Sequence, residues 1–241
     1  MRWKLPASIL RENKYLIRLA KGEDIGALTD LHIRSFHSDD HIPVMLGRDY
    51  VRATYRWLVN GENAYALVAE EAWKIIGLVA VCDGPFTGRM FKACLPELLK
   101  SLILNPKLLL NRRLWRRLFQ RSANNKLSRR IVNCPRFAQM TIGAVDENYR
   151  GHGVFPALVD ATKYYSRERG SRAIRAGVYK NNHSSRRVFI KGGWLEISEL
   201  ETVDVAYYVF FIDSICEKEI EIMCHLSAPG QRDSSHDRGG L

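Results

Sequence analysis

A short glycine loop forms the most informative stretch of the chain. It lies between an apolar, strand-like segment, 138–145, and a helical pattern, 154–169. Glycines let the backbone approach a ligand closely, and the N–H groups that open a helix carry partial positive charge. Such a loop can therefore hold a diphosphate without a charged side chain. The predicted diphosphate-binding amides belong to Arg150, Gly151, His152, Gly153, Val154 and Phe155.

A second group of residues follows this helix at fixed spacing. After another strand-like segment, 172–179, come Asn182, then Phe189 seven residues later, and then Gly193 with Trp194. Glycine turns alone are common. The ordered series of strand, glycine loop, helix, strand, Asn and Gly-Trp is much more specific.

This series resembles the acyl-CoA signature of the GCN5-related N-acetyltransferase (GNAT) superfamily. The family pattern Gln/Arg-x-x-Gly-x-Gly/Ala falls on residues 150–155, where Phe155 departs from the small residue expected at the last position. In the later motif, Phe189 stands where the family has a Tyr. The opening of the chain also fits the family's first strand, acidic turn and helix. The resemblance covers roughly residues 14–83 and 136–212.

The resemblance implies an α/β fold with a mixed, mostly antiparallel central sheet flanked by helices. We expect one acyltransferase domain over residues 14–212, because a chain of 241 residues ordinarily builds one core. A helical, basic insertion, 84–135, interrupts this domain between the third and fourth strands. The C-terminal extension, 213–241, is rich in Gly, Ser, Asp and Arg near its end and is expected to be partly disordered.

The resemblance also implies direct transfer of an acyl group from acetyl-CoA, or another short acyl-CoA, to an amine. In the family a backbone N–H at the end of the fourth strand polarises the thioester, and Val145 occupies the matching place. One such donor contributes on the order of 3 kcal/mol. Gly143 and Ala144 would face the pantetheine arm, and Phe189 belongs to the same cofactor-binding set. Asn182 either contacts the cofactor or has a structural role in a turn.

Proton transfer needs groups that the family pattern does not supply here. Phe189 cannot act as the acid that the family's Tyr provides, so Tyr179 or a water takes this role, or no dedicated acid exists. His37 and His41 are the candidate bases, because an imidazole ionises near neutral pH. The alternative is that they belong to an ordinary polar loop. Asp146, directly after the fourth strand, is expected in a solvated turn.

The excess positive charge lies in one segment. The formal net charge is +11, and residues 88–130 contain twelve basic residues and one acid, so the remainder is neutral. A helix over 107–120 is predicted, with leucines and a Trp on one side and arginines mainly on the other. This helix either packs on its own domain, which we favour, or contacts an anionic membrane surface. The basic residues do not alternate with aromatic residues that could stack on bases, so no nucleic-acid partner is expected.

The acceptor is predicted to be a small-molecule amine. A nucleotide-linked amino sugar is the first choice, because arginines pair bidentately with phosphate. Two alternatives remain open: a protein or peptide N-acetyltransferase, and a non-catalytic acyl-CoA-binding module on a membrane surface or partner. A homodimer is a further expectation. Widely spaced cysteines predict no metal site, and the lack of a long apolar run or secretion signal predicts a cytoplasmic protein.

Overall fold

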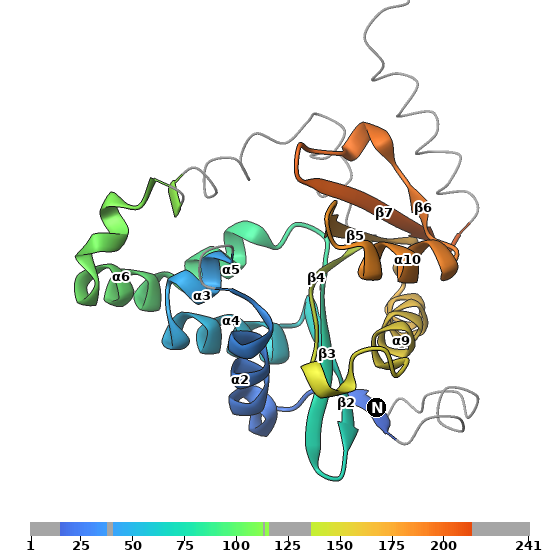
Figure 1. Cartoon of the computed structure of the whole chain (residues 1–241), viewed down its shortest axis with the longest axis horizontal. Helices are drawn as coiled ribbons and strands as arrows, with labels where there is room; N and C mark the ends of the chain where they lie inside the picture. The colour runs from blue at the N-terminus through green and yellow to red at the C-terminus, as the bar shows by residue number, and fades with distance from the viewer. Residues whose placement is uncertain (1–14, 38–40, 113, 116–135, 214–241) are drawn as a thin grey trace, which may run out of the picture.

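The fold is a mixed β-sheet between two groups of helices (Figure 1). The computed structural model describes residues 15–37, 41–112, 114–115 and 136–213. One face of the sheet is covered by α2 (Ile25–Ser35) and α4 (Arg48–Asn60). The other is covered by α9 (Val154–Glu168) and α10 (His183–Lys191). The predicted α/β fold with helices on both faces is confirmed.

Within the described residues the sheet has seven strands in the order β1-β2-β3-β4-β5-β7-β6. Only β4 and β5 pair in parallel, and every other neighbouring pair is antiparallel. The strands are β1 (Leu16–Leu19), β2 (Ala64–Glu71), β3 (Lys74–Asp83), β4 (Phe137–Val145), β5 (Ala173–Tyr179), β6 (Leu195–Glu196) and β7 (Val205–Phe211). The mostly antiparallel character expected from the sequence is therefore present.

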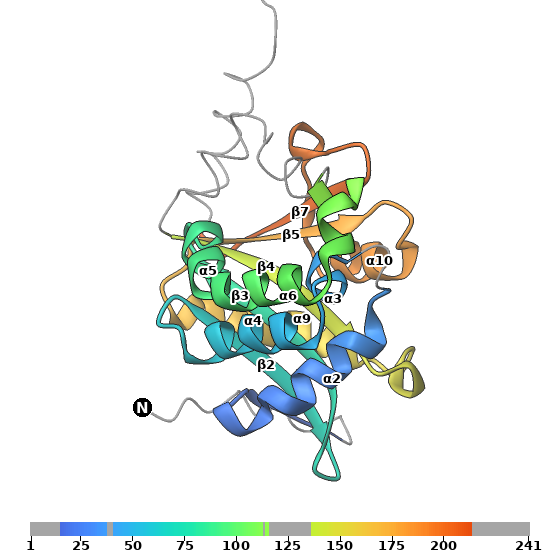
Figure 2. The same cartoon turned by 90° about the vertical axis from the view of Figure 1, so that its left-hand side faces the viewer.

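Short helices complete the described part of the chain. They are η1 (Gly22–Asp24), α3 (Ile42–Met45), α5 (Thr87–Ala93), α6 (Leu95–Leu104), η2 (Pro106–Leu110), η3 (Glu147–Tyr149) and η4 (Ser198–Leu200). Because α5, α6 and η2 lie between β3 and β4, the predicted helical insertion is where the sequence placed it. Figure 2 shows α5 and α6 next to α4, and both helices contact it.

The residues of α9 explain both how it packs on the sheet and where it ends. Its inward residues Leu158, Val159, Thr162 and Tyr165 are buried at helical spacing against the sheet. At its C-terminus the Gly170 amide donates to Arg167 O at 2.9 Å and the Ser171 amide to Ser166 O at 2.9 Å. This pair of bonds is the Schellman pattern that ends a helix at a glycine. The helix therefore ends where the helical pattern predicted over 154–169 ends, next to Gly170.

The first strand is fixed to the sheet by an ion-pair cluster. The Arg18 guanidinium lies 2.7 Å from Asp24 and 2.6 Å from Glu70 on β2. The Asp24 carboxylate also accepts the Lys21 amide at 2.7 Å. Asp24 therefore closes η1 and pairs with Arg18, and its side chain does not cap α2.

The basic insertion differs in part from its prediction. Its first two helices, α5 and α6, meet at Cys94, and Pro96 is accommodated in the first turn of α6. The predicted helix over 107–120 is wrong over its first part, where η2 is a 3-10 helix that begins at Pro106. Leu110 is 83% exposed and Leu114 is 1% exposed, so these two leucines do not share a face. The rest of the predicted helix, apart from 111–112 and 114–115, lies outside the described residues.

The predicted C-terminal extension, 213–241, lies outside the described residues except for Asp213. Of the helices that the structure describes, none has both the length and the apolar character needed to cross a membrane.

A buried histidine joins the helices of the α2–α4 layer. His32 on α2 is fully buried, and its Nδ1 lies 2.8 Å from the Tyr55 hydroxyl on α4. Its Nε2 lies 3.1 Å from His41 Nδ1. Burial, and then the charge of His41, lower the pKa of His32 to about 3. Folding therefore keeps this ring neutral at pH values where a free imidazole would ionise.

This neutral histidine makes stability depend on pH. The native protein protonates His32 only near its lowered pKa, whereas the unfolded chain takes up that proton below about pH 6.5. Between these values the unfolded state binds more protons, so the free energy of unfolding rises with pH. We expect His32 to lower that free energy by about 2 kcal/mol between pH 7 and pH 5. Urea unfolding at both pH values measures the loss.

His32→Phe should be less stable than wild type at pH 7, because the Tyr55 hydroxyl loses its partner. It should also show a smaller loss between pH 7 and pH 5. The control His37→Gln replaces an exposed histidine and should keep the wild-type pH dependence. An unchanged slope in His32→Phe would contradict a neutral buried His32.

Candidate active site

Strands β4 and β5 part from one another halfway along their length. Their parallel register pairs residues 137–140 with 173–176 and ends there. Beyond this point β4 stays paired with β3 as far as Val145, and β5 stays paired with β7 as far as Tyr179. The edges of 141–145 and 177–179 are therefore not paired with each other. Backbone N–H and C=O groups on these edges are available to a ligand.

A β-bulge lies at the point where the strands part. Ala80 pairs with Ile142 and Val81 with Met140, so Thr141 is an extra residue on β4. Its hydroxyl donates to Ala80 O at 3.1 Å. Before the bulge Met140 packs in the core under α9, and after it Ile142 packs in the core under α2 and α4. The bulge therefore reverses which side chains of β4 face each layer.

The register also fixes which amides of β4 face its open edge. The Asp146 amide donates to Ile76 O on β3 at 2.8 Å. Because backbone groups alternate along a strand, the amide of Ala144 points to β3 as well. The amides of Gly143 and Val145 point to the opposite side, toward the unpaired edge of β5.

The glycine loop leads directly into the first turn of α9. Gly151 and Gly153 have φ values of 80° and 78°, which favour glycine. The N–H groups of Val154 and Phe155 have no intrahelical acceptor, because they lie in the first turn. Pro156 also lies in this turn and has no N–H to lose. The predicted anion-binding arrangement of glycines and helix N-terminus is thus present.

Two side chains of the loop bond to its own backbone. The Arg150 Nε donates to Val145 O at 3.4 Å, which links the loop to the end of β4. The His152 Nδ1 lies 2.9 Å from Arg150 O, and since a carbonyl only accepts, the ring nitrogen donates. Both side chains are exposed.

Phe155 extends from the loop helix toward α10 across the region where the strands part. A Cβ on Gly143 would lie 2.7 Å from the Phe155 ring, so only glycine fits at this point of β4. On its other side the Phe155 ring meets Phe189 edge to face, with centroids 6.0 Å apart. The large ring at position 155, where the family pattern has a small residue, is therefore accommodated because residue 143 on β4 has no side chain.

Phe189 is a core residue. It is 2% exposed, stacks on Tyr208 with centroids 5.5 Å apart, and meets Trp194 edge to face at 5.0 Å. Its ring carries no group that can donate a proton. The position that holds the family's Tyr serves packing in this chain.

Asn182 and Tyr179 lie at the end of β5. The Asn182 side chain accepts the Ser185 amide at 3.1 Å and so caps α10, which is the structural one of its two predicted roles. Tyr179 is 47% exposed. Its neighbour Val178 packs in the core under α9, so Tyr179 lies on the opposite face of the sheet.

Asp146 does not lie in a solvated turn, as was expected. It is buried, accepts the Asn148 amide at 3.2 Å, and lies 3.2 Å from Lys74 and 3.7 Å from Arg34. Burial alone would raise its pKa, but the hydrogen bonds from Lys74 and the Asn148 amide and the two positive charges outweigh it. The pKa is therefore lowered, and Asp146 stays ionised. It is a structural acid that fixes the end of β4.

The two candidate bases occupy different surroundings. His37 is exposed, whereas His41 is half-buried and stacks on Phe36 with ring centroids 4.4 Å apart. His41 also meets His32, and Phe36 packs in the same core as Ile142 of β4. Only His41 is therefore part of an ordered group on the α2 side of β4.

Sequence reasoning did not select three residues of this region. His32 and Tyr55 form the hydrogen-bonded chain to His41, and the only sequence signal is a histidine on the apolar face of a helix. The Tyr15 hydroxyl is buried and has no hydrogen-bond partner in the described part of the chain. It would lie 4.0 Å from a Cβ on Gly153, beside the glycine loop.

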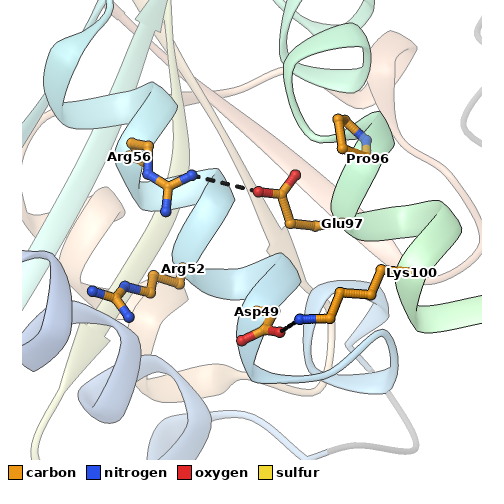
Figure 3. Close-up of a pocket in the computed structure, with 6 residues that line it drawn as sticks. All are labelled: Asp49, Arg52, Arg56, Pro96, Glu97 and Lys100. Atoms are coloured by element: carbon orange, nitrogen blue, oxygen red, sulfur yellow. Dashed lines mark hydrogen bonds and ion pairs between the residues drawn. The ribbon is translucent and has the colours of Figure 1, made fainter. Parts of the chain in front are cut away.

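A charged pocket of about 300 Å³ lies elsewhere, between α4 and α6 (Figure 3). Its lining residues are Asp49, Arg52, Arg56, Pro96, Glu97 and Lys100. Lys100 lies 2.7 Å from Asp49 and Arg56 lies 3.4 Å from Glu97, so these pairs join the insertion to α4. The pocket is on the exposed side of α4 and is not part of the site at β4. No group of three or more His, Cys, Asp or Glu suited to a metal is found among the described residues.

Solved structures share this fold. The GNAT domain of S. lividans PAT matches with a TM-score of 0.54 and 15% identity, over 82% of this chain and 90% of that one. A ribosomal-protein-alanine N-acetyltransferase from Brucella melitensis matches with a TM-score of 0.52 and 16% identity, over 82% and 99%. NAA60 from Arabidopsis thaliana, solved with acetyl-CoA, matches with a TM-score of 0.51 and 14% identity, over 82% and 98%.

The sequence comparisons agree with the fold. Among curated proteins, no sequence gives a significant match. The family model described as acetyltransferase (GNAT) family matches residues 111–194, which include β4, the glycine loop, α9, β5 and α10. In sequence over these residues, and in fold over most of the described chain, the protein matches the acetyltransferases of the GNAT family.

Proposed function

We propose that the protein is an N-acetyltransferase that moves an acetyl or other short acyl group from CoA to a primary amine. The observation that carries this proposal is the unpaired edge of β4, which runs directly into two glycines and the open N-terminus of α9. The Arabidopsis structure of the same fold contains acetyl-CoA. One edge and one helix end thus offer backbone donors to the two polar parts of a single extended cofactor.

In this proposal the amides of residues 151–155 hold the diphosphate, and the edge amides of β4 bind the rest. The Arg150 amide, which was also predicted to bind the diphosphate, instead donates to Glu147 O at 3.3 Å. Val145 is the predicted donor to the thioester oxygen, and Gly143, two residues earlier on the same edge, is a second donor. An extended pantetheine arm leads away from the loop along β4. The reach of the pantetheine arm along β4 therefore decides whether the Val145 amide contacts the thioester oxygen or an amide of the arm itself. Either amide is fixed by the sheet before the substrate arrives, which is what stabilises a developing oxyanion.

Proton transfer is assigned to His41 and Tyr179. The acceptor ammonium loses one proton to His41, and the amine attacks the thioester carbon. As the tetrahedral intermediate collapses, the C–S bond breaks, the nitrogen gives up its second proton, and the leaving thiolate of CoA takes up one proton. His32 orients His41 when its Nε2 accepts from His41 Nδ1, because the neutral His41 ring then keeps its lone pair on Nε2. Tyr179 can donate a proton to the thiolate, since Phe189 cannot.

The acceptor is proposed to be a small-molecule amine, with a nucleotide-linked amino sugar as the first choice. The basic residues of the insertion support a phosphate-bearing acceptor. A protein N-terminus is the second candidate. It is favoured by the fold shared with ribosomal-protein-alanine N-acetyltransferases from Brucella melitensis and Escherichia coli.

The test is calorimetric titration with acetyl-CoA, followed by thiol release with a panel of amines, nucleotide amino sugars and peptides. We expect saturable binding of acetyl-CoA and thiol release with one acceptor class. Gly153→Val should weaken acetyl-CoA binding at least about tenfold, because a β-branched residue at this positive φ displaces the loop amides. No heat with saturating acetyl-CoA would refute the proposed function. Binding without thiol release would favour the non-catalytic alternative.

His41→Gln should lower kcat by roughly 100-fold at neutral pH, because the proposed base is lost. His37→Gln is the matched control and should change kcat less than about twofold, because His37 is exposed. The wild-type pH–rate profile should rise between about pH 5 and 8, and this limb should be absent in His41→Gln. Equal kinetics of the two variants would exclude His41 as the base.

Phe155 is expected to restrict the length of the acyl group, because its ring contacts Gly143 and Phe189 where β4 and β5 part. Phe155→Ala should raise kcat/KM for butanoyl-CoA relative to acetyl-CoA by about tenfold or more. Phe211→Ala, a partly buried aromatic in a separate cluster, is the control and should leave this ratio unchanged. If both variants keep the wild-type ratio, Phe155 does not border the acyl group.

A further inference from the structure

The insertion between β3 and β4 leaves much of its aliphatic surface uncovered. Neither α5, α6 nor η2 contains a buried residue, although the segment is rich in leucine. We define the insertion patch as Leu95, Leu99, Ile103, Leu104, Leu109 and Leu110. Their exposed fractions are 37%, 51%, 78%, 73%, 49% and 83%. All six lie on two consecutive elements, α6 and η2, and exposed apolar surface gathered on one segment of a folded domain marks an interaction site.

The helix α6 has apolar side chains both toward the protein, at Leu98, and toward solvent. Glu97 and Lys100 face α4, where they pair with Arg56 and Asp49 (Figure 3). Leu95, Leu99 and Ile103 are spaced four residues apart and follow a stripe on the side opposite Glu97. Leu98, which packs against a buried cluster, and the paired Glu97 and Lys100 thus attach α6 to the protein, while the stripe of Leu95, Leu99 and Ile103 faces outward.

The charge around the insertion patch has one sign. Residues 88–112 contain five basic residues and one acid, Glu97, which already pairs with Arg56. Lys92, Lys107 and Arg112 are exposed beside the patch. A second copy of the chain would bring like charges together across a twofold axis, which disfavours a dimer through this surface.

We propose that the insertion patch docks the protein on an anionic lipid bilayer. Exposed leucine and isoleucine with flanking lysine are the composition of helices that lie in a membrane interface. Phe91 on α5 is also exposed, and an aromatic ring suits a membrane interface as well as a protein interface. Protein interfaces are depleted in lysine, however, whereas lysines flank this surface. The aliphatic side chains would enter the acyl boundary, and the basic side chains would meet the anionic headgroups.

The position of the insertion patch suits this role. Figure 1 shows α6 at the outer end of the α2–α4 layer, while α9 lies on the other face of the sheet. Contact with a flat surface through α6 therefore leaves the glycine loop before α9 accessible from solution. Docking through the patch is compatible with the binding of a soluble acyl-CoA.

The probe is sedimentation of the full chain with vesicles of phosphatidylcholine, with and without phosphatidylserine. Wild type should pellet with the phosphatidylserine vesicles and much less with phosphatidylcholine alone. Leu99→Gln/Ile103→Gln/Leu110→Gln should lower the partition coefficient at least about tenfold. Lys92→Glu/Lys107→Glu should lower it roughly fivefold per lysine and weaken its dependence on salt.

The matched control replaces three exposed aliphatic residues outside the insertion, Ile190→Gln/Leu195→Gln/Val203→Gln, and should pellet like wild type. All variants should keep the thermal transition and acetyl-CoA titration of wild type, which separates this test from that of the proposed function. Three outcomes would overturn the proposal. They are no pelleting of wild type with phosphatidylserine vesicles, equal pelleting of the triple insertion variant, and a wild-type dimer that this variant converts to monomer.

Discussion

The structure of the site depends on a single constraint, the parting of β4 from β5 after four paired residues. A sheet that kept this parallel pairing would leave no backbone donors for a ligand. The bulge at Thr141 lies where the pairing ends, and β3 and β7 hold the two strands in place beyond it. The edge of β4 that no longer pairs with β5 is therefore still held by its pairing with β3 on the other side. Its amides point in a fixed direction before any ligand binds.

Around this edge, the two departures from the family pattern have structural explanations. Phe189 replaces a Tyr and becomes part of an aromatic cluster with Tyr208 and Trp194. Phe155 replaces a small residue and is accommodated because Gly143 presents only backbone. Both rings fill space between β4, α9 and α10. The polar functions of the site consequently fall on main-chain amides and on residues of the opposite layer, such as His41.

The sequence predicted those features that depend on neighbouring residues. The glycine loop, the start of α9 and its stop at Gly170 are local signals, and the structure contains them. The helix expected over 107–120 was wrong at its start, because the spacing of apolar residues did not distinguish an α-helix from the 3-10 helix η2. The chain from Tyr55 through His32 to His41 joins residues far apart in sequence, and the bulge at Thr141 has no sequence mark. Both arise from tertiary packing, which no local pattern encodes.

The close approach of Phe155 to Gly143 also constrains how this chain can evolve. Any side chain at position 143 meets the ring at 2.7 Å, so a larger residue there is tolerated only after position 155 has become smaller. The two sites therefore form an epistatic pair, in which the order of substitutions matters. A lineage in which position 155 became small would gain freedom at position 143, and its descendants could then diverge along a path closed to this protein.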